Sequence, residues 1–317
     1  MRKPRPHPEY LPEYLATKAF LFLAQALPLP TALRMGEWGG RQMMRWTPGQ
    51  VKTAVENLMA AYPGMERPQA EEMARRVYEH FGRSLVEVAM AHRLLKPDSL
   101  ERHVIIRNEQ RLRDVIAAGK GAICLTAHLG LWEIIGLALR RHGVDPVTVY
   151  RPVHNPYMDR ELRRRRALLG QRMIPRVGAL PILLRTLRRN GYIALAVDQY
   201  AKGDGLSVPF FGRPASTTPA PALLAVRTGA PILMGYARRV EGTYRFELFV
   251  DELLYATPGA DRDEEVLRVT TEISRRLEGY VRQCPEQWLW MHRRWRVPHS
   301  KADAKGAMNA GPSGASD

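Results

Sequence analysis

Apolar side chains in the first third of the chain recur at helical spacing. In residues 69–92 they stand three and four positions apart, as Val77 and Phe81 do, which is the period of one face of an α-helix. Prolines interrupt the pattern at intervals and separate one helix from the next. We therefore predict a mainly helical region over residues 1–115, with helices that include 53–61 and 69–92.

Beyond about residue 119, short apolar runs rich in β-branched residues alternate with helical ones. This alternation predicts an α/β fold, a central mixed sheet with flanking helices. The predicted strands are 122–126, 147–150, 192–197, 232–239 and 244–250, and the predicted helices are 131–141, 156–169, 179–189, 220–228 and 263–283. The glycine- and proline-rich segment 202–219 is predicted to be a loop. The α/β core is expected to span 116–298, followed by a disordered tail over 299–317.

The most membrane-like segment is residues 15–33. Its apolar run, 19–29, is only about half of the roughly 20 residues that a spanning helix needs, and Lys18, Pro28 and Pro30 interrupt the segment. It fits either a helix that packs in the core or an interfacial or short membrane anchor. Basic residues around it favour the anchor, so we predict an N-terminal region that contacts the membrane.

Charge narrows the range of partners. The 317 residues include 48 Lys and Arg against 32 Asp and Glu, a net charge of +16, while the 45% of hydrophobic residues is typical of a globular protein. Such a basic excess indicates a negative partner: nucleic acid, an anionic membrane surface, or an acidic or phosphorylated substrate. The two cysteines, Cys124 and Cys284, are too few for a disulfide framework or a zinc module.

The strongest local candidate for chemistry follows the first strand of the predicted sheet. His128 comes just after that strand, Gly130 permits a sharp turn, and Glu133 stands where the next helix begins. On one helix the two side chains would point apart, but a loop histidine can meet a carboxylate in the first helical turn. We predict a general base, His128, oriented by Glu133 through one ring nitrogen. The spacing by itself also fits a structural histidine beside a helix N-terminus.

Four further segments accompany this block, in a fixed order along the chain. They are Tyr150-Arg151-Pro152 with Asn155, Pro156, Asp159 and Arg166; Val197-Asp198-Gln199; Val208-Pro209-Phe210-Phe211-Gly212 with Thr217 and Thr218; and Pro285-Glu286-Gln287-Trp288 with Trp290, His292, Arg293, Arg294 and Trp295. Together with residues 126–133 they resemble the bacterial lipid A late acyltransferases, the lauroyl and myristoyl transferases of lipopolysaccharide assembly. That family belongs to the lysophospholipid acyltransferase superfamily, with its H-x4-D/E motif. The resemblance covers about residues 10–298.

The resemblance implies transfer of a fatty acyl chain from the thioester of acyl carrier protein to a hydroxyl of a phosphorylated lipid A precursor. It also implies that the enzyme acts at the cytoplasmic face of the bacterial inner membrane, on an anionic surface. It implies that the reaction uses neither a metal nor another cofactor. An alcohol that attacks a thioester needs a general base and donors for the developing oxyanion. Backbone amides near Gly130 and arginine side chains are candidates for those donors. Cys124 fits a small buried apolar side chain rather than a nucleophile.

Other polar residues are candidates for substrate binding. Arg151 follows the second predicted strand, and Asp198 and Gln199 follow the third, where α/β sheets place their ligands. Arg166 belongs to the arginine cluster at 160–166 and matches the family's arginine, and a guanidinium suits bidentate binding of phosphate or carboxylate. The cluster also fits a solvated helix face, and Asp198 also fits a structural carboxylate paired with an arginine.

Two rival functions remain open. One is acylation of another glycolipid or of a lysophospholipid, because related enzymes acylate mannosylated phosphatidylinositol. The other is a basic, non-catalytic protein that binds membranes or nucleic acid, although no aromatic residues interleave with the arginines and nucleic acid is not expected. Near the C-terminus, His292, Arg293 and Arg294 fit either an anion clamp or a helix cap.

Overall fold

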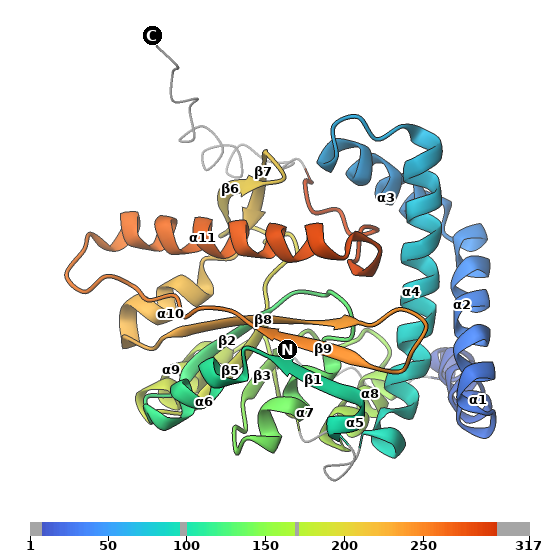
Figure 1. Ribbon diagram of the computed structural model, residues 1–317, viewed down its shortest axis with the longest axis horizontal. Coiled ribbons are helices and arrows are strands. Elements are labelled where there is room, and N and C mark those ends of the chain that lie inside the picture. Colours follow the sequence, from blue (N-terminus) through green and yellow to red (C-terminus); the bar gives the residue numbers. More distant parts are fainter. Residues whose placement is uncertain (1–7, 96–99, 169–170, 297–317) are drawn as a thin grey trace.

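The computed structural model describes residues 8–95, 100–168 and 171–296 (Figure 1). A twisted sheet lies between layers of helices, and a helical bundle stands at one end of it. Within the described ranges the sheet has seven strands in the order β1-β9-β8-β2-β5-β3-β4. Neighbouring strands are parallel except β8 and β9. The predicted α/β fold with a central mixed sheet is thereby confirmed, while the predicted tail over 299–317 lies outside the described residues.

The elements have the following bounds. The strands are β1 (Val104–Arg107), β2 (Ala122–Thr126), β3 (Val147–Tyr150), β4 (Arg172–Pro175), β5 (Tyr192–Ala196), β6 (Leu206–Phe210), β7 (Arg213–Thr217), β8 (Ile232–Arg239) and β9 (Phe246–Val250). The helices are α1 (Leu11–Ala26), α2 (Leu29–Trp46), α3 (Pro48–Ala61), α4 (Arg67–Leu94), α5 (Leu100–His103), α6 (Glu109–Ala117), α7 (Glu133–Arg141), α8 (Pro156–Leu168), α9 (Ala179–Arg188), α10 (Ala220–Thr228) and α11 (Arg262–Gln283).

Strand β2 shows why both faces of the sheet are covered. Its side chains point alternately to the two faces. Ile123 and Leu125 join the core formed with α9, α10 and α11, while Cys124 joins the core formed with α6 and α7. A strand that is apolar on both faces belongs in the interior of such a sheet. This places the carboxyl end of β2 near the middle of the molecule.

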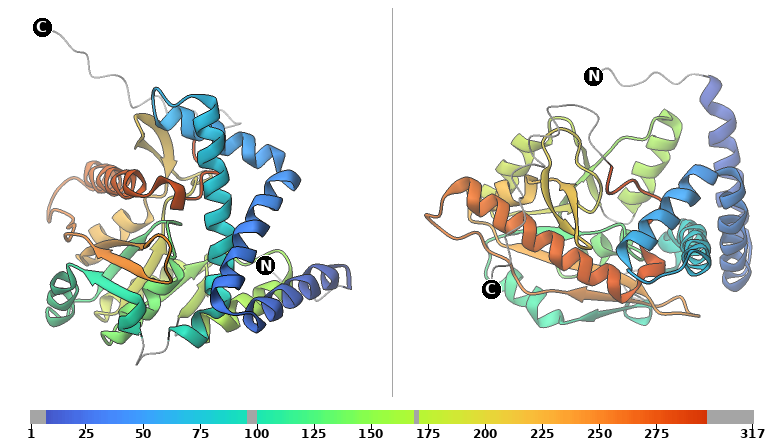
Figure 2. Two further views of the ribbon diagram at one scale, coloured as in Figure 1. Left: turned by 45° about the vertical axis from the view of Figure 1, so that its right-hand side comes forward. Right: turned by 90° about the horizontal axis from the view of Figure 1, so that it is seen from above.

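The N-terminal helices form the bundle at the end of the sheet, at the right of Figure 1. Helices α2 and α4 pack so closely that a Cβ atom at Gly40 would lie 2.1 Å from the carbonyl oxygen of Tyr78. A further core, with Val86 of α4 and Phe246 of β9, joins the bundle to the sheet. Figure 2 shows from two other directions that α4 lies between the sheet and the outer helices α1 and α2.

Four strands of the described residues, β1, β4, β6 and β7, lie where the sequence pattern did not predict them. Segment 202–219, predicted to be a loop, contains the antiparallel hairpin of β6 and β7, in which Pro209 faces Pro214. A hairpin with two free edges tolerates prolines that a central strand would not. The predicted helical region includes β1, which pairs with β9, and β4 follows α8. Both β1 and β4 are four-residue edge strands, too short to show a period.

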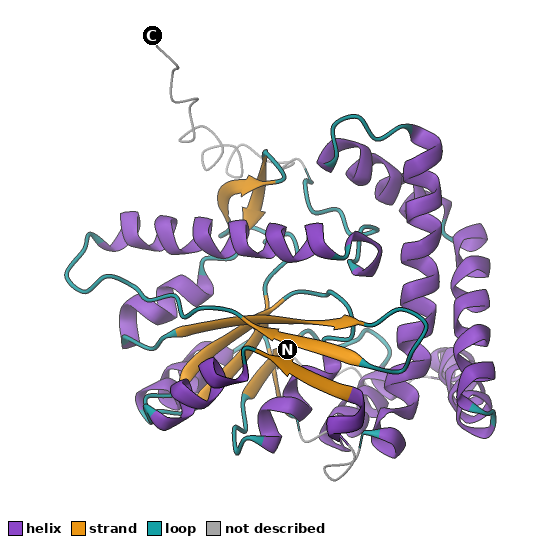
Figure 3. Cartoon of the chain, in the orientation of Figure 1, coloured by secondary structure: helices purple, strands orange, loops and turns teal. Residues whose placement is uncertain are grey.

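The predicted membrane segment 15–33 forms parts of two helices rather than one. Helix α1 ends at Ala26 and α2 begins at Leu29, with Pro28 between them, and Figure 3 shows the break. Among the described residues, no helix combines the length and the apolar character needed to cross a bilayer.

Candidate active site

Strand pairing brings a histidine and an aspartate together at one edge of the sheet. Strands β2 and β5 are parallel neighbours, with Thr126 opposite Ala196. His128 and Asp198 each lie two residues further on, so both stand at the carboxyl ends of their strands, where α/β sheets place ligands. The Nδ1 atom of His128 lies 2.8 Å from Oδ1 of Asp198. The Asp198 side chain is 2% exposed and that of His128 is 25% exposed.

The second oxygen of Asp198 is also occupied. It accepts a hydrogen bond from the backbone N–H of His128, at 3.0 Å, and another from Nε1 of Trp288, at 2.9 Å. Three donors therefore hold this carboxylate in one orientation. A carboxylate accepts, so Nδ1 of neutral His128 carries the proton and Nε2 has the free lone pair. This is the tautomer that a general base needs.

The two charges shift each other's titration. Burial acts to lower the pKa of His128, but the Asp198 carboxylate outweighs it, and the pKa of His128 is raised above 6.5. For Asp198, burial acts to raise the pKa, but His128 and the hydrogen-bond donors outweigh it and lower the pKa to about 2. Asp198 is thus ionised at neutral pH, and it stabilises the imidazolium that forms when His128 takes a proton.

The turn after His128 is fixed by the protein interior. Gly130 has a φ of 59°, and a Cβ atom there would lie 1.7 Å from the carbonyl oxygen of Ala237, so this position requires glycine. The N–H of Gly130 donates to the carbonyl of Gln287, at 2.9 Å, and the N–H of Leu131 donates to that of Ala237, at 3.0 Å. Both amides are therefore committed to the protein's own carbonyls.

Glu133, at the start of α7, is held by an arginine from α8. Arg166 donates from Nε and Nη2 to the two Glu133 oxygens, at 3.0 Å and 2.6 Å. Both side chains are largely buried, at 17% exposure for Arg166 and 8% for Glu133. Gln171 adds a bond to the Glu133 carbonyl, at 2.9 Å. The result is a bidentate ion pair next to the His128 turn, and both of its charges act on the His128 imidazole.

Comparison with known proteins gives the family. The sequence profile described as "Bacterial lipid A biosynthesis acyltransferase" matches residues 2–297. The chain belongs to this family. It is 26% identical over 301 residues to the lipid A biosynthesis lauroyltransferase of Escherichia coli K12, covering 92% of this chain and 93% of that one. It is 24% identical to the palmitoleoyltransferase of the same organism, with the same coverage. A phosphatidylinositol mannoside acyltransferase of Mycobacterium tuberculosis is 28% identical and covers 71% of this chain and 70% of its own.

For this acyltransferase, the structure corrects one expectation about the histidine. The sequence predicted that Glu133 orients His128, but Asp198 occupies Nδ1, and Glu133 pairs with Arg166 instead. The reason is the strand order, which puts the end of β5 beside the end of β2, whereas the start of α7 faces α8. The signal for Asp198 was its place at the end of a predicted strand. The pattern of apolar residues does not predict which strand lies next to β2.

The other predicted substrate-binding residues are exposed or lie on α8. Arg151 is exposed directly after β3, and Gln199 is exposed after Asp198. The arginines of α8 form two kinds of ion pair, within the helix and with α7. Arg163 pairs with Asp159, and Arg164 and Arg165 pair with Glu161, as neighbours on one helix, whereas Arg166 reaches Glu133. No group of three or more His, Cys, Asp or Glu residues in the described ranges is placed to hold a metal ion.

In the C-terminal segment, the His292 and Arg294 side chains contact other parts of the protein, while Arg293 is exposed. His292 accepts at Nε2 from the backbone N–H of Tyr200, at 2.9 Å, and burial lowers its pKa. Arg294 is fully buried and donates to the Ser216 carbonyl and to Oγ1 of Thr217, both at 2.6 Å. Its Nη1 also donates to the Gln199 carbonyl, at 3.3 Å, so Arg294 joins the β6–β7 hairpin to the segment after β5. Burial lowers the pKa of Arg294 to about 10, so this residue stays charged.

Proposed function

We propose that this acyltransferase moves a fatty acyl chain from the thioester of acyl carrier protein to a hydroxyl of a lipid A precursor, with His128 as general base. The observation that carries this proposal is the buried Asp198 carboxylate, which holds Nδ1 of His128 and leaves Nε2 free. Asp198, rather than Glu133, takes the orienting role. No metal or other cofactor is needed for this reaction, because a thioester is already activated.

The proposed reaction has two proton transfers. Nε2 of His128 takes the proton of the acceptor hydroxyl as its oxygen attacks the thioester carbonyl, and a tetrahedral oxyanion forms. The carbon–sulfur bond then breaks, the imidazolium returns the proton to the leaving thiolate, and the ester and free carrier-protein thiol leave. Asp198 stays ionised throughout and offsets the charge on the imidazolium.

Oxyanion stabilisation is assigned to Arg166 rather than to the turn. The backbone amides of Gly130 and Leu131 already donate within the protein, which removes two of the expected donors. Arg166 places its charge close enough to act on His128 and uses Nε and Nη2 for Glu133. Its Nη1 is the nitrogen that we assign to a substrate oxygen, and Glu133 fixes the plane of the guanidinium.

Membrane contact is assigned to the outer helices. Helix α1 exposes an apolar stripe at helical spacing, with Leu11 40%, Leu15 55% and Phe22 76% exposed. On α2, Trp38 and Trp46 are exposed as well. Exposed apolar side chains on a protein of charge +16 suit an anionic lipid surface. We propose that the enzyme works there, at the cytoplasmic face of the inner membrane.

A sedimentation assay with vesicles containing phosphatidylglycerol tests the membrane assignment. The double variant Leu15→Ser, Phe22→Ser should bind at least about tenfold more weakly, because each large apolar side chain contributes roughly 1.5–3 kcal/mol when buried. The matched control is Leu267→Ser, since Leu267 is 47% exposed on α11. Equal binding by the two variants would contradict the proposal that α1 contacts the membrane.

The acceptor and donor are tested by product mass. Purified protein is incubated with acyl carrier proteins of several chain lengths and with either a tetra-acylated lipid A precursor or a phosphatidylinositol mannoside. The second acceptor is included because a relative covering 71% of this chain bears that name. Ester formation on the lipid A precursor, lost in His128→Ala, supports the proposal. Ester formation only on the mannoside favours the alternative acceptor, and an active His128→Ala variant contradicts the mechanism.

A further inference from the structure

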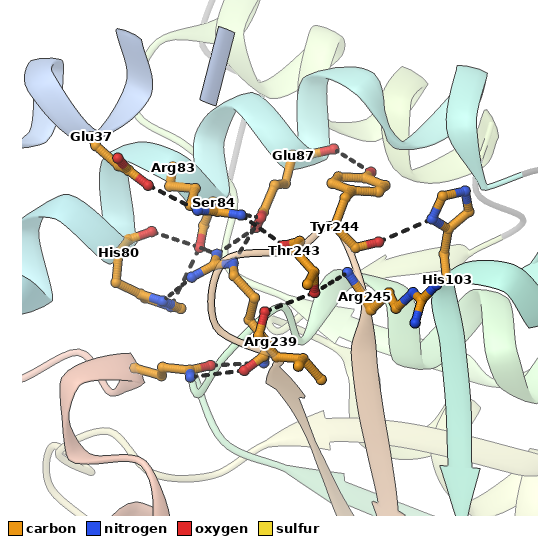
Figure 4. A network of polar contacts seen from close by, with 12 residues as sticks. Glu37, His80, Arg83, Ser84, Glu87, His103, Arg239, Thr243, Tyr244 and Arg245 are labelled. Atoms are coloured by element: carbon orange, nitrogen blue, oxygen red, sulfur yellow. Dashed lines mark hydrogen bonds and ion pairs between the residues drawn. The ribbon is translucent and has the colours of Figure 1, made fainter. Parts of the chain in front are cut away.

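We propose that His80 is a positioning residue for this reaction, held by the buried pair Glu87–Arg239 and acting on the turn that carries His128. The inference rests on the proposed function. His80 and Glu87 come from α4, and Arg239 ends β8 (Figure 4). The helical bundle would then be part of the catalytic scaffold as well as a membrane-contacting region.

The ion pair is buried and well connected. Nε of Arg239 donates to Oε1 of Glu87 at 2.7 Å, and its Nη2 contacts the other oxygen. Glu87 is fully buried and Arg239 is 7% exposed. Arg83 bonds both Glu87, at 3.1 Å, and Glu37, at 2.9 Å, so two arginines balance two carboxylates. A buried ion pair gains little stability over apolar side chains, so stability alone is a weak reason for this network.

The Glu87–Arg239 pair determines the tautomer and the protonation of His80. Nη1 of Arg239 lies 2.5 Å from Nδ1 of His80. A guanidinium only donates, so Nδ1 accepts and the ring proton sits on Nε2. The backbone of Gly130, two residues after His128, also acts on the ring and opposes the lowering of its pKa. Burial and the charge of Arg239 hold the pKa of His80 well below 6.5, so the ring stays neutral with one defined tautomer.

A second connection runs through the backbone of Arg239. Its N–H donates to Oε1 of Gln287 at 2.8 Å, and its carbonyl accepts from Nε2 of Gln287 at 3.2 Å. The Gln287 carbonyl in turn accepts from the N–H of Gly130. His80, His128 and Gln287 line one small hollow. A change in the Glu87–Arg239 pair can therefore shift Gly130 both through the His80 ring and through Gln287. A packed interior transmits such shifts.

The test separates positioning from folding. We would measure kcat, KM and the unfolding temperature of wild type, His80→Leu, His80→Gln and the double variant Glu87→Leu, Arg239→Met, using the donor and acceptor that wild type turns over fastest. His80→Leu should lower kcat about 10- to 100-fold, as a small misplacement of a catalytic group does. Its KM should change less than about threefold, because no substrate contact is altered. His80→Gln keeps a side-chain N–H and should recover most of the lost kcat.

The double variant is the decisive comparison. Removing both charges together should leave the unfolding temperature near that of wild type, while kcat falls as it does in His80→Leu. Wild-type kcat in His80→Leu, or in a folded double variant, would overturn the inference, as would a loss that follows the unfolding temperature and is not rescued by His80→Gln. If the double variant does not fold, the two His80 variants decide.

His128→Ala separates this inference from the function on which it rests. If His128→Ala is inactive and His80→Leu is fully active, only the positioning role is lost. If His128→Ala is as active as wild type, the proposed function itself fails, whatever the His80 variants do.

Discussion

Replacing Asp198 by asparagine tests which carboxylate serves His128. In the wild-type protein, Oδ2 of Asp198 accepts from two fixed donors, the His128 N–H and Trp288 Nε1. The asparagine carbonyl oxygen must take that place, which turns its NH₂ group toward Nδ1 of His128. Nδ1 then has to accept, and the ring proton moves to Nε2. The variant therefore holds the histidine in the tautomer that cannot act as a base.

The size of the effect follows from the electrostatics. The pKa of Asp198 falls from 3.8 to about 2 on folding, which corresponds to roughly 2–3 kcal/mol of interaction at about 1.4 kcal/mol per pKa unit. The charge of His128 is the largest of the causes that lower this pKa, so we expect loss of the carboxylate to lower kcat by about 10²-fold. The wrong tautomer adds to this, up to a total of about 10⁴-fold. We expect Asp198→Asn to fall within this range.

The pH profile gives an independent measure. His128 acts as a base only when neutral, and its pKa is raised above 6.5, so wild-type kcat/KM should fall as the pH drops through that raised pKa. In Asp198→Asn the carboxylate is gone and burial remains, so the acid limb of the residual activity should move to lower pH. In Glu133→Gln the limb should move less, because the effect of Glu133 on His128 is smaller than that of Asp198.

The free energy of unfolding should depend on pH in the range set by the pKa values of Asp198 and His128. Asp198, with a lowered folded pKa, contributes stability that is present above about pH 4 and is lost as the pH falls toward 2. His128, with a raised folded pKa, contributes stability that is present below pH 6.5 and is lost as the pH rises through that pKa. The stability difference between wild type and Asp198→Asn should therefore be largest between these limits. A Glu133→Gln variant that loses more kcat than Asp198→Asn, with the larger shift of the acid limb, would refute this assignment.

Three further predictions concern the surroundings of the pair. Arg166→Ala leaves Glu133 buried without its partner and should cost about 3–5 kcal/mol of unfolding free energy together with most activity. Its neighbour Arg164 is exposed, so Arg164→Ala should cost less than about 1 kcal/mol in the same denaturant titration. Gly130→Ala should abolish activity and lower the unfolding temperature, because the added Cβ meets backbone; a folded, active variant would contradict the turn geometry. Trp288→Phe removes a charge-assisted hydrogen bond of about 1.5–3 kcal/mol and should reduce kcat roughly tenfold; unchanged kcat and pH profile would mean that this donor is dispensable.

Much of this fold was accessible from local patterns in the sequence. Strands such as 122–126 and 192–197 are short apolar runs, and the long helices show their period over many residues, so hydrophobic burial alone predicts them. The same local pattern placed His128 and Asp198 at strand ends. The edge strands and the β6–β7 hairpin were missed because their few residues are set by pairing with distant segments rather than by a period of their own.

The contacts that define the site depend on tertiary structure. His128 and Glu133 are close in sequence, which made their pairing a natural prediction, yet the partner of His128 lies 70 residues away. Arg239 and Glu87 are 152 residues apart, and neither stands in a recognisable motif. Local propensity decides whether a segment becomes a strand or a helix. Which carboxylate meets which cation depends on strand order and on how α4 packs against the sheet, because a charge leaves water only where the whole fold supplies it with a partner.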